Sequence, residues 1–142
     1  MSVGQTERRT QNRVVSFLVE ELGYNYLGNF QDDEPHGNVE EDRLRQWLKR
    51  RGEPDELAKR ALQKLESARQ VGGQRSLYQA NKEVYQLMRY GASVKARPGA
   101  KSRPVKLIDW ENERVNNFAV AEEVPVTGVN DKRPDVVLYV NG

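Results

Sequence analysis

A chain of 142 residues can bury roughly 70% of the surface that it exposes when unfolded, so it forms one domain, or a large part of one, without covalent staples. It has no cysteine and only one histidine, which excludes disulfides, thiolate metal sites and His-rich zinc sites and favours a reducing cytoplasm. The net charge of +2 does not by itself indicate a class of partner. The sequence shows neither a long apolar run nor a secretory signal, so we expect a cytoplasmic protein with no membrane partner.

The first half of the chain is predicted to be helical. Apolar residues recur at helical spacing, and Gly or Pro marks the ends of each segment. The expected helices cover residues 7–22, 38–51, 54–71 and 76–90, and residues 24–37 are expected to form a loop. Five aromatic residues are predicted to be core or packing residues: Trp47, Tyr78, Tyr85, Tyr90 and Trp110.

After Gly91 the period of the apolar residues changes from 3.6 to about 2, or to short apolar runs. Val94 begins a short strand, and a basic loop around Gly99 predicts a hairpin. Further strands are expected at residues 105–110, 118–126 and 135–140. Helices over residues 1–91 followed by strands over residues 92–142 predict an α+β fold with a mostly antiparallel sheet.

Charge is unevenly distributed over the second half. Six basic residues and no acid lie between Arg89 and Lys106, whereas five acids and one arginine lie between Asp109 and Glu123. A basic stretch beside an acidic one suits phosphate binding next to metal binding. Two solvated faces are the alternative explanation.

The final segment carries the clearest chemical feature. Pro134 and Asp135 precede an apolar run that is rich in β-branched residues and predicts a largely buried strand. An acid at the start of such a strand suits a hard cation, Mg²⁺, Mn²⁺ or Ca²⁺, because carboxylate oxygens are their preferred ligands. Alternatively, Asp135 is a turn residue that caps the strand.

Several blocks in order resemble a known family over nearly the whole chain. The chain resembles the N-terminal nuclease domain of the R (restriction) subunit of type I restriction-modification enzymes. The blocks are ELGYNYLGN (21–29), LYQANKEVY (77–85), LMRYG (87–91), LIDW (107–110), AEEV (121–124) and KRPD (132–135).

The resemblance implies a PD-(D/E)xK core that cuts double-stranded DNA with Mg²⁺. It also implies ATP-hydrolysing motor domains elsewhere in the subunit, and docking on the methyltransferase and specificity subunits. Asp135 matches the first acid of the motif and would be a metal ligand. No residue here matches the Glu-x-Lys that follows it in the family. We therefore expect residues 1–142 to form an incomplete restriction-endonuclease-like core with little or no cleavage activity alone.

Three further acids are candidates for the same site. Glu122 and Glu123 are adjacent on a predicted strand, so one faces each side and could approach the metal. The alternative is that one is solvated and the other forms a salt bridge. Glu7 is a third candidate, because related folds draw an acid from the helix before the strands; otherwise it is simply an acid near a helix N-terminus.

The basic stretch supplies candidates for contacts with DNA phosphates. Such contacts are salt-dependent and largely independent of sequence. The residues are Arg89, Lys95, Arg97, Lys101 and Arg103. A second class of function stays open beside the nuclease: a non-catalytic module that binds DNA or the restriction complex as a regulator or decoy.

Overall fold

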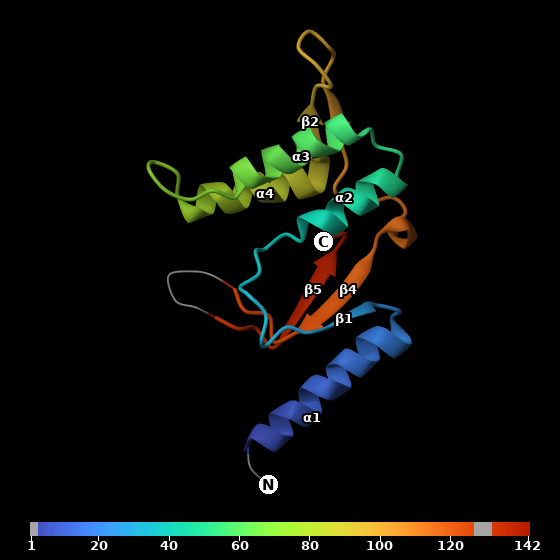
Figure 1. Cartoon of the computed structure of the whole chain (residues 1–142), viewed down its shortest axis with the longest axis vertical. Coiled ribbons are helices and arrows are strands. Elements are labelled where there is room, and N and C mark those ends of the chain that lie inside the picture. Colours follow the sequence, from blue (N-terminus) through green and yellow to red (C-terminus); the bar gives the residue numbers. More distant parts are fainter. Residues whose placement is uncertain (1–2, 127–131) are drawn as a thin grey trace. The chain divides into compact units, whose positions relative to one another are not determined.

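The computed structural model describes residues 3–126 and 132–142, and the chain divides into two compact units. The sheet unit consists of Met1–Glu40 and Asn117–Gly142, and the helical unit consists of Glu41–Asn116. Figure 1 traces both units in the colours of the sequence. Among the described residues, no helix combines the length and apolarity that a membrane crossing requires.

The sheet unit begins with α1 (Val3–Ser16), which continues as a π-helical turn over Phe17–Glu21. Its sheet has the strand order β1-β4-β5, with β1 at Asn25–Asn29, β4 at Phe118–Glu122 and β5 at Val136–Val140. Strand β4 lies in the middle, parallel to β1 and antiparallel to β5. The core residues of this unit are Ala119, Ala121, Val124 and Tyr139, against which Leu27, Phe30, Val126 and Val137 pack.

Within the sheet unit, the two residues that flank the helical unit in the sequence, Glu40 and Asn117, are hydrogen-bonded to Gly142 and Asn141. The backbone N–H of Glu40 donates to the carbonyl of Gly142 at 2.8 Å. On the other side, the N–H of Asn117 donates to Oδ1 of Asn141 at 2.6 Å, and the N–H of Asn141 donates back to the carbonyl of Asn117 at 2.7 Å. In the sequence, residues 41–116 are therefore an insertion between two parts of the sheet unit.

The helical unit contains α2 (Glu41–Arg50), α3 (Asp55–Ala68) and α4 (Leu77–Tyr90). The hairpin of β2 (Ala92–Val94) and β3 (Arg103–Val105) packs on α3, and a 3₁₀ turn covers Glu113–Val115. Ser76 and Gln79 form a capping box that fixes the start of α4. The apolar stripes of the three helices are buried: Leu44, Trp47, Leu48, Leu57, Ala58, Ala61, Leu62, Leu65, Ala68, Ala80 and Leu87.

The predicted α+β class is confirmed: apart from β1 the described helices α1 to α4 precede the strands, and two antiparallel pairings stand beside one parallel pairing. The loop predicted over residues 24–37 is wrong in its first part, because it contains β1. That segment does not alternate apolar and polar residues, and its strand hydrogen bonds come from distant β4. The strand predicted over 105–110 is also wrong beyond Val105, because the chain turns at Asp109, whose carboxylate accepts two backbone hydrogen bonds.

The prediction of five core aromatics is right only for Trp47. Its side chain is 2% exposed, and its Nε1 donates to the carbonyl of Val115 at 2.8 Å. The other four are exposed: Tyr78, Tyr85, Tyr90 and Trp110. The buried stripe of α4 runs instead through Ala80 and Leu87, seven positions apart on one helix face, so the tyrosines lie outside it.

Candidate functional site

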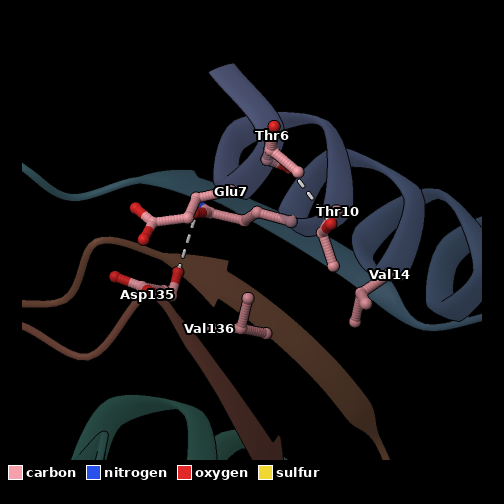
Figure 2. Close-up of a pocket in the computed structure, with 7 residues that line it drawn as sticks. Thr6, Glu7, Thr10, Val14, Asp135 and Val136 are labelled. Carbon is pink, nitrogen blue, oxygen red and sulfur yellow. Dashed lines mark hydrogen bonds between the residues drawn. The ribbon is translucent and has the colours of Figure 1, made fainter. Parts of the chain in front are cut away.

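The pocket that holds Asp135 lies in the sheet unit, between α1 and the start of β5. It has a volume of about 320 Å³ and is lined by Thr6, Glu7, Thr10, Gln11, Val14, Asp135 and Val136. The five residues from α1 follow helical spacing, so they share the helix face that looks onto the strand. In Figure 2 the carboxyl groups of Glu7 and Asp135 point toward the same end of this pocket. We refer to it as the α1–β5 pocket.

Gln11 ties α1 to the two strands beneath it. Its Nε2 donates to Oε2 of Glu122 at 2.6 Å and to the backbone carbonyl of Asp135 at 3.3 Å, the second bond being drawn in Figure 2. Gln11 follows Glu7 by four residues, which is one helical turn on the same face. The amide therefore fixes the height and rotation at which α1 presents Glu7 to Asp135.

Glu122 is a buried acid whose oxygens are occupied by neutral donors. Its side chain is 6% exposed; Oε1 accepts a hydrogen bond from the hydroxyl of Tyr26 at 2.7 Å, and Oε2 accepts the one from Gln11. The hydrogen bond to Glu122, followed by burial and the negative charge of Glu122, raises the pKa of Tyr26 above its ordinary value. Glu122 therefore works as an anchor for α1 and β1.

Glu123, the next residue, is also buried, and like Glu122 it faces a side chain of α1. It adopts a left-handed φ of 52° that terminates β4, and its Oε2 lies 3.0 Å from Nε of Arg133. Arg8 from α1 lies 3.9 Å from its Oε1, and the backbone N–H of Glu123 donates to the carbonyl of Asp135 at 3.0 Å. Neither glutamate of this pair is solvated: one is held by neutral donors and the other by two arginines.

Of the four acids singled out in the sequence, Glu7 and Asp135 share the pocket with exposed carboxylates. No group of three or more His, Cys, Asp or Glu that could hold a metal is found within residues 3–126 and 132–142. Two carboxylates nevertheless fit a magnesium ion, which usually keeps several waters and binds through one or two carboxylates. Glu7 and Asp135 are the residues that would hold it.

Gln11 and Tyr26, which organise this site, were not predicted from the sequence. Their hydrogen-bond partner Glu122 lies 111 and 96 positions away along the chain. The four-residue spacing between Glu7 and Gln11 is the one local signal that could have pointed to Gln11. An amide one turn after a candidate acid is placed to act on the same neighbour.

A second polar cluster of the sheet unit surrounds His36. The imidazole stacks on Phe30 with ring centroids 4.6 Å apart, and its Nδ1 and Nε2 lie 2.7 Å from Glu40 and 3.4 Å from Asp33. Burial lowers the pKa of His36, but the hydrogen bonds and negative charges of Glu40 and Asp33 raise it more, so it lies above its ordinary value. The two carboxylates therefore favour the charged form of the imidazole in the folded structure.

The candidate DNA-contacting residues all belong to the helical unit. Arg89 is the last basic residue of α4, and its guanidinium lies 5.2 Å from the ring centroid of Trp110. Lys95, Arg97 and Lys101 are exposed in the loop between β2 and β3, whereas Arg103 on β3 forms an ion pair with Glu53. In the helical unit, Asp109 is held by Arg51 at 2.7 Å, and its pKa is lowered mainly by the backbone hydrogen bond from Asn112.

Comparison with known proteins gives one family. The model of the type I restriction enzyme R protein N terminus matches residues 4–142, which is nearly the entire chain. No curated protein and no solved structure gives a significant match.

Proposed function

We propose that this chain, which belongs to the family of type I restriction enzyme R protein N termini, holds a divalent cation in the α1–β5 pocket for the cleavage of double-stranded DNA. One observation carries the proposal. Asp135, which matches the first acid of the nuclease motif, lines the same pocket as Glu7, an acid from the helix before the sheet.

Each of these two residues has a defined part in the proposed centre. Asp135 lies directly before β5, and its backbone carbonyl accepts hydrogen bonds from the backbone N–H of Glu123 and from Gln11. These bonds fix the backbone position from which the carboxylate extends. Glu7 approaches from α1 and brings a second negative charge. A divalent cation would relieve the repulsion between the two carboxylates.

A bound Mg²⁺ supplies an activated water and stabilises negative charge on the phosphate. Glu7 and Asp135 would hold the ion, while Glu122 keeps α1 in place through Gln11. We propose that the Glu-x-Lys implied by the family resemblance completes the centre in the R subunit. The family works in a complex with other type I subunits and DNA, and we propose the methyltransferase and specificity subunits as its protein partners.

Metal binding by the chain tests the site directly. We expect Mn²⁺, titrated calorimetrically into the 142-residue chain at low salt, to bind, and Asp135→Asn or Glu7→Gln to weaken binding at least about tenfold. Glu20→Gln is the matched control, because Glu20 is an exposed acid that follows α1 outside the pocket. Unchanged Mn²⁺ affinity in Asp135→Asn would remove the site assignment.

Cleavage is tested on a longer polypeptide that carries the Glu-x-Lys strand. We expect it to cut double-stranded DNA with Mg²⁺, and Asp135→Asn to abolish cutting. A longer polypeptide that cuts DNA equally well with Asp135→Asn would contradict the proposed role. If neither metal binding nor cleavage is found, the alternative function is favoured, which is a non-catalytic module that binds DNA or the restriction complex.

Contacts with the DNA backbone form a separate part of the proposal. We propose that Arg89, Lys95, Arg97, Lys101 and Arg103 contact phosphates of duplex DNA, as their charge suits salt-dependent binding. Reversing the charges of Lys101 and Arg103 should weaken duplex binding and reduce its dependence on salt. Identical binding of both proteins across a salt series would exclude this pair from the interface.

A further inference from the structure

An exposed cluster of two aromatic residues and an arginine lies at the C-terminal end of α4. The guanidinium of Arg89 lies 5.2 Å from the ring centroid of Trp110 and 5.8 Å from that of Tyr90. Trp110 is 54% exposed and Tyr90 is 70% exposed, so both residues are open to solvent. We call Arg89, Tyr90 and Trp110 the ring platform.

The ring platform is built into the fold. The indole Nε1 of Trp110 donates to the backbone carbonyl of Met88 at 2.9 Å, which fixes the plane of the ring against the last turn of α4. Gly91, with a φ of 87°, lets the chain pass directly from α4 into β2; a Cβ there would lie 2.9 Å from the carbonyl oxygen of Val105. The platform is therefore held at the base of the β2–β3 hairpin.

The hairpin that starts at this platform is basic. Three residue pairs join β2 and β3, which is about 10 Å of strand, and the loop beyond them carries Lys95, Arg97 and Lys101. Among the described residues, these three have no ion-pair partner. No acid occurs in the sequence between Arg89 and Lys106, and Glu53 pairs with Arg103 on β3, so the loop beyond the strands carries positive charge from Lys95, Arg97 and Lys101.

We propose that the ring platform and the basic hairpin loop bind a single-stranded segment of DNA, with bases stacked on Trp110 and Tyr90 and phosphates held by the loop. Open aromatic rings beside cations form the usual binding surface for unpaired nucleic acid, since every base offers a π-face. In a duplex those faces are already covered by neighbouring base pairs. Phosphate contacts alone would need no rings, and a neutral apolar protein partner would not need the lysines.

This inference goes beyond cleavage of duplex DNA and is independent of the metal site. It uses the same cations that are proposed to contact duplex phosphates, and the rings of Trp110 and Tyr90 are what distinguishes a single strand from a duplex. All its residues lie in the helical unit, and binding can be measured in EDTA. The probes are a labelled 12-nucleotide oligo-dT strand and a duplex of the same length, followed by fluorescence anisotropy with the 142-residue chain at several salt concentrations.

Trp110→Ala is expected to weaken binding of oligo-dT by about 5- to 150-fold and to change binding of the duplex little. Trp110→Phe should retain most of the affinity, because phenylalanine still stacks. Arg97→Ala should reduce the salt dependence, lowering the slope of log affinity against log salt by about 0.7. Tyr78→Ala is the matched control, since Tyr78 is a 73% exposed ring at the opposite end of the same helix.

Intrinsic fluorescence gives a second readout. Trp110 is exposed and Trp47 is buried, so unlabelled oligo-dT should quench emission of the wild-type protein but not of Trp110→Phe, in which Trp47 is the remaining tryptophan. Circular dichroism and thermal unfolding confirm that each variant is folded. The proposal is overturned if the duplex binds as tightly as oligo-dT, if oligo-dT does not bind at low salt, or if Tyr78→Ala weakens binding as much as Trp110→Ala.

Discussion

Replacing Gln11 with leucine tests whether the amide is what holds α1 on the sheet. The substitution keeps side-chain size and helix propensity nearly unchanged but removes both hydrogen bonds of the amide. The carbonyl of Asp135 loses little, because the backbone N–H of Glu123 still donates to it. Buried Glu122 loses one of its two side-chain donors and keeps only Tyr26.

The expected loss of stability follows from the hydrogen bonds that Gln11→Leu removes. A hydrogen bond to a charged group contributes about 1.5–3 kcal/mol to stability. Leucine recovers part of this by packing near Val14 in the pocket. The free energy of unfolding should therefore fall by about 1–2 kcal/mol, which corresponds to a decrease in Tm of about 3–8 °C for a chain of this size.

Urea and thermal unfolding measure the effect, and a double-mutant cycle assigns it. Tyr26→Phe removes the other donor to Glu122, so the two substitutions should be non-additive because they share one buried acceptor. Asn12→Leu, an exposed position next to Gln11, should be neutral or slightly stabilising. If Gln11→Leu were as stable as the wild type, the amide would not be the link between α1 and the strands.

Three further outcomes are expected. Because the pKa of His36 is raised in the folded state, its stabilising effect is complete below its ordinary pKa of 6.5 and is lost as pH rises through the folded value; His36→Gln should flatten urea stability curves across that window. Ser76→Ala should lower the free energy of unfolding by about 1 kcal/mol, measured by urea, because it removes the cap of α4; no change would show that the capping box is dispensable. Gly91→Ala should cost more in Tm than Gly52→Ala, since both have positive φ but only position 91 adds a clash with Val105; equal losses would contradict this reasoning.

Local pattern accounts for much of this fold, and the errors have physical causes. Strand β5 could be predicted because its apolar residues follow Asp135 in one continuous run. The helices could be predicted because their apolar residues recur at each helical turn. Strand β1 could not, since it becomes a strand only by pairing with β4. The aromatic residues of α4 were misplaced because bulk and apolarity do not reveal which helix face meets a partner.

Some residues of the candidate site could be predicted from the sequence, and the surroundings of others could not. Asp135 and Glu7 were identified as acids at the start of a strand and a helix, and the structure brings them to one pocket. The distinct surroundings of Glu122 and Glu123 could not be foreseen, because adjacent acids look identical in sequence. Only the folded chain places Tyr26 and Gln11 on one and Arg133 and Arg8 on the other.

The hydrogen bonds of Glu40 and Asn117 with the last two residues, Gly142 and Asn141, also bear on the order of events during protein synthesis. Glu40 and Asn117 both find hydrogen-bond partners there, and β4 finds β5 immediately before it. While the ribosome is still translating the codons before that point, the helical unit is already fully made, whereas α1 and β1 await their partners. The helical unit can thus fold on the emerging chain, whereas Glu7 and Asp135 come together only after Asp135 has left the ribosome.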